Sequence, residues 1–296
     1  MKHVDLTGMG VVLITPFQTN GEVDYPALAR LVDFQLQNDT DYLLVLGTNA
    51  ETSTLTISEQ KEITRFVVEK VKGRIPIVLG MSGNNTKAVV ERLKTEDMDG
   101  VDAILSVVPY YNKPSQEGIY QHYKAIAQAT SAPIVLYNVP GRTVTNMTAE
   151  TTLRLARDFD NVIAVKEASG NMAQIGTIIK HKPEDFQVIS GDDGMTLPLI
   201  ALGLVGVISV IGNAFPKEFS RMVHLALSGD YANALSIHLN FLELFDLLFT
   251  DGSPAGIKSV LSMMGYVENE LRLPLVPVRP ATYEKIRNVL QELQVK

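Results

Sequence analysis

Short apolar runs alternate with longer amphipathic stretches along most of the chain. Runs rich in Val, Ile and Leu predict eight strands, at residues 10–15, 42–46, 75–80, 103–107, 134–137, 162–166, 187–190 and 206–209. Runs that are apolar at nearly every position are typical of parallel strands buried on both faces. Helical periodicity lies between them, most clearly at 25–37, 58–72, 116–130 and 148–157, with Ser58 and Thr148 as helix-start residues. Eight strands, each followed by a helix, predict an α/β fold, the (β/α)8 or TIM barrel.

An open, doubly wound sheet is the rival architecture. Such a sheet is expected to carry a glycine-rich G-x-G-x-x-G turn after its first strand. The corresponding turn here is Thr-Pro-Phe-Gln at 15–18. The sequence therefore favours the barrel.

The alternating pattern stops near residues 228–230. Three further helical stretches follow, at 231–249, 254–264 and 280–294, and a proline-rich connector occupies 273–280. We therefore expect a barrel at 1–229 with its active site at the carboxyl ends of the strands, and a small helical domain at 230–296.

Composition narrows the functional class. The chain has 296 residues and a net charge of −7, which disfavours nucleic acid or an anionic membrane as a partner. It has no cysteine, which excludes disulfides, thiolate catalysis and cysteine-ligated metals. The first apolar run, 9–17, suits a strand and not a signal peptide, and no apolar stretch is long enough to span a membrane. We therefore expect a cytoplasmic protein.

Lys166 is the most informative residue. It ends the apolar run 161–166 and is followed by a turn that contains glycine. At the end of a buried strand, desolvation disfavours the ammonium form and lowers the pKa of the amine. A neutral amine can attack a carbonyl, so the position suits a lysine that forms a Schiff base. Taken alone, Lys166 is more simply explained by a side chain that extends to solvent.

The other predicted strand ends change that judgement, because catalytic residues of barrels gather there. The turn at Thr48 and Asn49 offers amides and a hydroxyl that can hold a small carboxylate. Tyr137 can carry protons to and from an imine-forming oxygen, and Arg142 can bind a carboxylate with its guanidinium. Each also has a plainer explanation: a common turn, a core tyrosine, a surface arginine.

Two adjacent tyrosines follow the fourth strand. Tyr111 could add a second phenol to a proton relay, whereas Tyr110 is more simply explained by packing.

Metal chemistry is not indicated. The five histidines are scattered, whereas a metal site needs clustered ligands. Asp192 and Asp193 could bind Mg²⁺, but Asp193 is more simply the cap of the following helix. The negative charges of two adjacent carboxylates would also repel the phosphate group of a substrate. We therefore expect no metal, no cofactor and a substrate without a phosphate group.

Taken together, these motifs resemble the dihydrodipicolinate synthase family, in order and spacing, over essentially the whole chain. The matching segments are Gly-Thr at 47–48, Tyr-Tyr-Asn-Lys-Pro at 110–114, Tyr-Asn-Val-Pro-Gly-Arg-Thr at 137–143, Val-Lys-Glu-Ala-Ser-Gly at 165–170 and Ser-Gly-Asp-Asp at 190–193. The wider superfamily includes N-acetylneuraminate lyase and 2-keto-3-deoxy sugar-acid aldolases. It shares the barrel, the Schiff-base lysine and the tyrosine of the fifth strand, and Arg142 points to the synthase branch.

The resemblance implies a lyase of lysine and diaminopimelate biosynthesis. Lys166 would form an imine with pyruvate, and the derived enamine would attack L-aspartate 4-semialdehyde to give 4-hydroxy-tetrahydrodipicolinate. Tyr137, Thr48 and Tyr111 would form the proton relay, with Tyr111 supplied by a neighbouring subunit of a homotetramer built as a dimer of dimers.

The resemblance also assigns the binding groups. Thr48 and Asn49 would hold the carboxylate of pyruvate, and Arg142 that of the semialdehyde. Backbone groups of Gly191 and Ile208 would line the pyruvate pocket.

The sequence departs from the family in two places. The family usually has Gly-Thr-Thr-Gly-Glu where this chain has Gly-Thr-Asn-Ala-Glu at 47–51, so we expect altered affinity for pyruvate. Of the positions that bind inhibitory lysine in sensitive relatives, Asn84 and Tyr110 match. Gln60 replaces a histidine and Ala88 replaces a glutamate, so we expect weak or no inhibition by lysine.

Two alternatives remain. An aldolase acting on a 2-keto-3-deoxy sugar acid or on N-acetylneuraminate would need a polyol-binding loop where this chain has Arg142. A keto-acid sensor without turnover would not need the relay of Tyr137, Thr48 and Tyr111.

Overall fold

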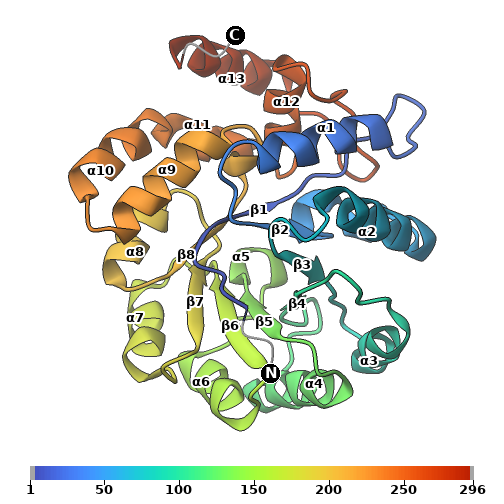
Figure 1. The fold of residues 1–296 in the computed structure, drawn as a ribbon, viewed down its shortest axis with the longest axis vertical. Helices are drawn as coiled ribbons and strands as arrows, with labels where there is room; N and C mark the ends of the chain where they lie inside the picture. Colours follow the sequence, from blue (N-terminus) through green and yellow to red (C-terminus); the bar gives the residue numbers. More distant parts are fainter. Residues whose placement is uncertain (1–3, 294–296) are drawn as a thin grey trace.

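Eight parallel strands close into a barrel in chain order, with helices around it (Figure 1). The computed structural model describes residues 4–293. The strands are β1 (Gly8–Val12), β2 (Tyr42–Val45), β3 (Ile77–Gly80), β4 (Ala103–Val107), β5 (Ile134–Asn138), β6 (Val162–Glu167), β7 (Gln187–Ser190) and β8 (Gly206–Ser209). β1 pairs with β2 on one side and with β8 on the other, which closes the sheet. The predicted barrel is confirmed.

The strands form at the apolar runs, and nearly all of their residues are buried. This is expected of parallel strands that are covered on both faces. Three predicted boundaries, in two of the strands, were wrong by two residues or more. The first strand begins at Gly8 and ends at Val12, although residues 13–15 are still buried, which explains why the apolar pattern continues past the strand. The third begins at Ile77, not at residue 75.

The helices that follow the strands are α1 (Tyr25–Leu36), α2 (Ile57–Val71), α3 (Thr86–Thr95), α4 (Gln116–Ala129), α5 (Pro140–Thr143), α6 (Ala149–Asp158), α7 (Met172–His181), α8 (Thr196–Leu202) and α9 (Pro216–Leu227). Three short 3-10 helices are η1 (Thr48–Ala50), η2 (Thr52–Thr54) and η3 (Ile211–Asn213). Thr148 caps α6 as predicted. The start expected at Ser58 was wrong, because Thr56 caps α2 in a reciprocal capping box with Glu59.

Within the described residues, α9 is followed by four helices, α10 (Tyr231–Asn240), α11 (Leu242–Thr250), α12 (Ala255–Met263) and α13 (Pro280–Glu292). We call residues 231–293 the C-terminal part. The single helix predicted at 231–249 is two helices that meet at Phe241, whose ring packs 5.0 Å from that of Phe215. Figure 1 shows α12 and α13 beyond α1 and α11, on one side of the barrel.

The outermost residues of the predicted segments 1–229, 230–296 and 280–294 lie outside the described residues. Among residues 4–293, none of the helices has both the length and the apolar character needed to cross a membrane.

Candidate active site

A cavity of about 350 Å³ lies at the carboxyl ends of the strands, where the barrel meets the C-terminal part. Its lining comes from the ends of several strands and from α11: Val12, Thr48, Asn49, Tyr137, Val139, Arg142, Lys166, Ala168, Gly191, Asp192, Asp193, Gly194, Val210, Phe245, Asp246 and Phe249. Six of the residues selected from the sequence as catalytic or substrate-binding therefore share one cavity.

Lys166 lies near the end of β6 and is only 4% exposed. Its register partner on β5 is Tyr137, and its Nζ lies 4.5 Å from the centre of the Tyr137 ring. Burial lowers the pKa of Lys166 to about 7; the negative charge of Asp193 opposes this shift and the positive charge of Arg142 adds to it. A large fraction of this amine is therefore neutral and nucleophilic near neutral pH.

The phenol of Tyr137 remains protonated at neutral pH. Burial raises its pKa, and the charge of Arg142 and a hydrogen bond with the Thr48 side chain partly offset that rise. When the neutral amine attacks a carbonyl carbon, a protonated phenol beside it can donate a proton to the oxygen that leaves that carbon.

The turn after β2 brings Thr48 and Asn49 to the cavity in η1. Asn49 is 2% exposed, and its Oδ1 accepts a hydrogen bond from the Ser253 hydroxyl at 3.1 Å. Its Nδ2 has no partner within the described part of the chain. An unpaired buried amide donor at a cavity wall is costly unless a ligand accepts from it.

Arg142 lies in the one-turn helix α5 that follows β5, and it is exposed while it lines the cavity. The guanidinium can therefore meet a carboxylate that arrives from solvent. It also lies close enough to Lys166 for its charge to lower the pKa of that amine.

Gly191 follows β7 and packs directly against the side chain of Lys166. A Cβ at this position would lie 3.0 Å from Cε of Lys166 and 2.8 Å from Cβ of Ala168. Only glycine leaves the Lys166 side chain in place.

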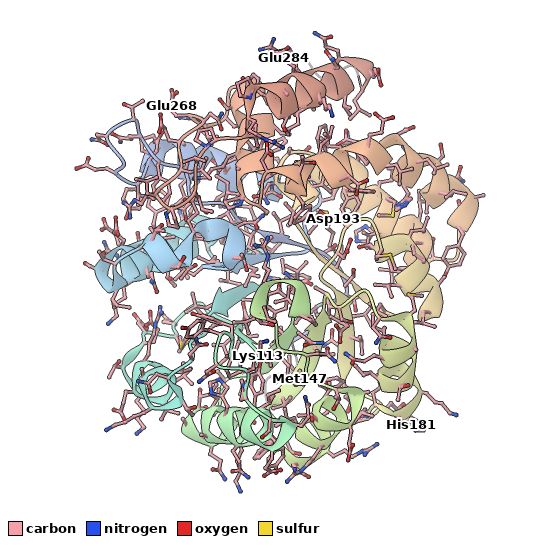
Figure 2. The ribbon with its side chains drawn as sticks, turned by 180° about the vertical axis from the view of Figure 1, so that it is seen from behind. Lys113, Met147, His181, Asp193, Glu268 and Glu284 are labelled. Carbon is pink, nitrogen blue, oxygen red and sulfur yellow. The ribbon has the colours of Figure 1, made fainter. Side chains whose placement is uncertain are left out.

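The structure corrects the expectation for Asp193. Its Oδ2 accepts hydrogen bonds from the backbone N–H groups of Val210 and Ile211 at 3.0 and 2.8 Å, so it does not cap α8. Asp192 accepts instead from the N–H of Met195, at the start of that helix. Burial raises the pKa of Asp193 to about 6. Figure 2 shows Asp193 near the centre of the molecule, where the barrel meets the C-terminal part.

Four other residues selected from the sequence lie away from the cavity lining. Tyr111 is 88% exposed, with a positive φ of 71°, and Tyr110 is also exposed. Asn84 Oδ1 accepts from the N–H of Tyr110 at 2.9 Å, so the structure brings these two together. Ile208 is buried within β8.

The helix α11 also contributes to the cavity, and nothing in the sequence predicted this. Phe245, Asp246 and Phe249 line the cavity from a helix far along the chain. Their spacing is that of an ordinary amphipathic helix, so no local signal marks them as site residues.

A closed parallel barrel with a buried lysine of lowered pKa on β6, next to a tyrosine on β5, defines a lyase of the Schiff-base aldolase type. The chain matches the Dihydrodipicolinate synthetase family over residues 5–293, and it belongs to this family.

Individual relatives of this family match the chain over all or nearly all of its length. A protein of Parabacteroides distasonis named 4-hydroxy-tetrahydrodipicolinate synthase is 70% identical over 296 residues, which is all of both chains. The crystal structure of dihydrodipicolinate synthase from Aquifex aeolicus is 42% identical, with a TM-score of 0.95 and coverage of 98% of this chain and 99% of that one. A monomeric dihydrodipicolinate synthase variant is 40% identical, also with a TM-score of 0.95, and covers 98% and 97%.

Proposed function

We propose that the chain condenses pyruvate with L-aspartate 4-semialdehyde through a Schiff base on Lys166 and forms 4-hydroxy-tetrahydrodipicolinate. The observation that carries the proposal is the buried amine of Lys166, with its pKa near 7, beside Tyr137. The name of the Parabacteroides relative supports the choice of substrates. Arg142 in the cavity lining supports it too, because the second substrate carries a carboxylate.

The chemistry follows from these groups. The neutral Nζ of Lys166 attacks the ketone carbon of pyruvate, and Tyr137 protonates the hydroxyl that leaves as water. The resulting imine makes the methyl group acidic, and loss of one proton gives the enamine. The enamine carbon bonds to the aldehyde carbon of the semialdehyde. The amino group of that substrate then displaces Lys166 and closes the ring.

Binding uses a different set of groups. Thr48 and the unpaired Nδ2 of Asn49 hold the pyruvate carboxylate, and the protein matches that negative charge with hydrogen-bond donors. Gly191 shapes the pocket from its wall, whereas Ile208, which does not line the cavity, contributes only through the backbone of β8 behind it. Arg142 holds the carboxylate of the semialdehyde.

Tyr111 completes the proton relay from a neighbouring subunit of a homotetramer, a dimer of dimers. Its exposure and its position outside the cavity of its own chain support this role. One solved relative is a monomeric variant. The oligomeric state of this chain should therefore be measured by light scattering. A cytoplasmic location and the division into a barrel at 1–229 and a helical domain at 230–296 stay predictions.

The test is trapping with borohydride followed by turnover. Borohydride with pyruvate should add the mass of the reduced pyruvate adduct to the peptide that contains Lys166, and Lys166→Ala should show no adduct. Purified protein should then consume pyruvate quickly with aspartate 4-semialdehyde, and slowly with N-acetylmannosamine or glyceraldehyde. Trapping at Lys166 with turnover only of a sugar aldehyde would keep the nucleophile and refute the substrate assignment.

A further inference from the structure

Glu51 is a buried carboxylate directly after η1, and the C-terminal part of the chain holds it. Its Oε1 accepts from Nζ of Lys258 in α12 at 2.5 Å, and its Oε2 accepts from the backbone N–H of Arg272 at 3.0 Å. Both side chains of the Glu51–Lys258 ion pair are 0% exposed. Lys258 also donates to the carbonyl of Glu270 at 2.8 Å. A segment about 200 residues away in sequence is thus bound to the loop that carries Thr48.

The backbone of Glu51 shapes that loop. Glu51 has a φ of 54°, in the left-handed region that residues with a side chain seldom adopt. Its N–H donates to the carbonyl of Thr48 at 3.1 Å and closes the turn, and its carbonyl accepts from the N–H of Thr54 at 2.9 Å. Because the bonds to the carboxylate hold this residue in place, they also support the conformation of the turn.

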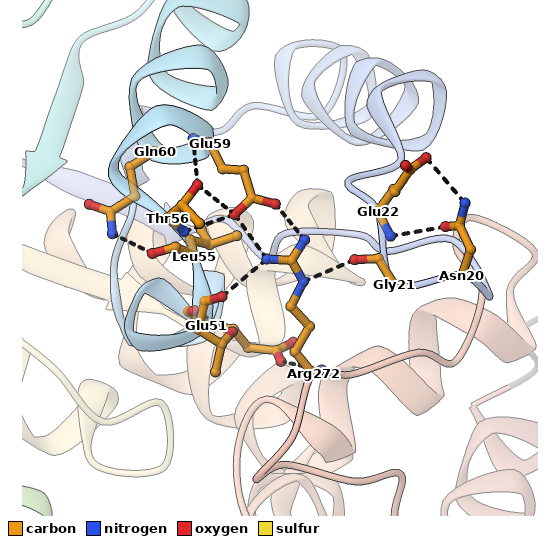
Figure 3. Close-up of polar contacts among 10 residues, drawn as sticks. Asn20, Gly21, Glu22, Glu51, Leu55, Thr56, Glu59, Gln60 and Arg272 are labelled. Carbon is orange, nitrogen blue, oxygen red and sulfur yellow. Dashed lines mark hydrogen bonds and ion pairs between the residues drawn. The ribbon is translucent and has the colours of Figure 1, made fainter.

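Arg272 extends the network to the start of α2 (Figure 3). Its guanidinium donates to both carboxylate oxygens of Glu59, at 3.0 and 2.5 Å, and to the carbonyls of Thr54 and Gly21, at 3.1 and 2.9 Å. Together, two cations and two carboxylates lock the loop after β2 onto the C-terminal part.

A second contact reaches the same turn from the same side. The hydroxyl of Ser253 donates to Oδ1 of Asn49, which turns the amide so that its Nδ2 has no partner in residues 4–293. The C-terminal part therefore holds the turn on both sides of Ala50.

We propose that this network, which rests on the proposed function above, positions the turn at Thr48 and Asn49 for the carboxylate of pyruvate. Glu51, Lys258 and Ser253 are positioning residues: they act on the substrate through the turn. A purely stabilising role explains the network less well, because a buried ion pair adds little stability relative to apolar groups of similar size. What it does provide is a single geometry of the loop.

The test is Glu51→Gln, which keeps the size of the side chain and an acceptor for the Arg272 N–H but removes the charge that binds Lys258. We expect the KM for pyruvate to rise about 10-fold or more, while kcat at saturating pyruvate stays within about 3-fold and the KM for the aldehyde is unchanged. The matched control is Asp41→Asn, at the opposite end of β2. Asp41 accepts from the N–H of Met9 at 2.6 Å and pairs with His224 at 2.9 Å. This variant should lose thermal stability and keep the wild-type KM for pyruvate.

Loss of stability in Glu51→Gln with an unchanged KM for pyruvate would overturn the proposal. If Glu51→Gln does not fold, Ser253→Ala decides, since it removes one hydroxyl: a rise of about 3-fold or more in the KM for pyruvate supports the proposal and a wild-type value overturns it. The pyruvate concentration that gives half-maximal borohydride trapping measures the same effect without a second substrate. It therefore separates failure of this inference from failure of the proposed condensation.

Discussion

Asn138 and Glu167 are register partners across β5 and β6, one residue beyond Tyr137 and Lys166. Nδ2 of Asn138 donates to both carboxylate oxygens of Glu167, at 3.1 and 3.2 Å. Because side chains alternate along a strand, this pair points away from the cavity that Tyr137 and Lys166 line. Oδ1 of Asn138 accepts from the N–H of Met147 at 2.9 Å, so the pair fixes the far end of the loop that carries Arg142.

Asn138→Ala should therefore weaken binding of the second substrate. The variant loses the bonds to Met147 and to buried Glu167, and the loop with Arg142 becomes less ordered. We expect a loss of about 2–3 kcal/mol of unfolding free energy and a rise of about 10-fold in the KM for aspartate 4-semialdehyde. Thermal denaturation and steady-state kinetics measure the two effects. An unchanged KM for the semialdehyde in a destabilised variant would contradict the role assigned to the loop.

Imine formation should follow the titration of Lys166. With a pKa of about 7, the neutral fraction of the amine is near one half at pH 7. For an ordinary lysine at that pH it is of the order of one in a few thousand. We therefore expect kcat/KM for pyruvate to rise from pH 6, to be half-maximal near pH 7 and to level off above pH 8. A profile that still rises steeply above pH 9 would contradict a lowered pKa.

Charge changes beside Lys166 should move that profile in opposite directions. Arg142 lowers the pKa of Lys166 and Asp193 raises it. Arg142→Gln should therefore shift the profile to higher pH, and Asp193→Asn should shift it to lower pH. The pH dependence of borohydride trapping with pyruvate measures both shifts without the second substrate. Shifts of the same sign in the two variants would refute the electrostatic account.

Much of the barrel was predictable because its signals are local. A run such as 134–137 is buried on both faces, so nearly every position is apolar and the strand is visible in sequence. The catalytic candidates were predictable for the same reason, since Lys166 and Tyr137 stand at the ends of such runs. The break between α10 and α11 carries no proline or glycine, and packing of the Phe241 ring against Phe215 and against Phe219 of α9 accompanies it, so periodicity alone predicted one helix.

The contacts from the C-terminal part could not be predicted. Ser253 and Lys258 lie in unremarkable sequence, and they meet Asn49 and Glu51 only because the chain returns to the barrel mouth. The bond from Asp193 to the start of η3 is long-range as well, whereas helix capping is local, which is why capping was expected. Tertiary pairing of distant segments leaves no periodic trace in either partner.

L-Lysine should inhibit weakly or not at all. Gln60, at the position of a histidine in sensitive relatives, is buried and already bonded: its Nε2 donates to the carbonyls of Thr52 and Leu55, and its Oε1 accepts from Arg92. Ala88 supplies no carboxylate for the lysine ammonium. We expect less than about half inhibition at millimolar lysine, measured at the KM of pyruvate. Half-maximal inhibition at low-micromolar lysine would show that other residues form the site.

Gly191→Ala should lower activity without unfolding the protein. The added Cβ would lie 2.8 Å from Cβ of Ala168 and 3.0 Å from Cε of Lys166, and the flexible lysine chain is the neighbour that can move. A displacement of even a few tenths of an ångström moves Nζ relative to Tyr137, so we expect kcat/KM for pyruvate to fall about 10- to 100-fold. The matched control is Gly176→Ala within α7, where a Cβ meets nothing within 4 Å. That variant should keep full activity and gain about 0.5–1 kcal/mol of stability, because alanine favours the helix. Equal loss of activity in the two variants would show that the effect of Gly191→Ala does not arise from displacement of Lys166. It would then refute the role of Gly191 in keeping the lysine side chain in position.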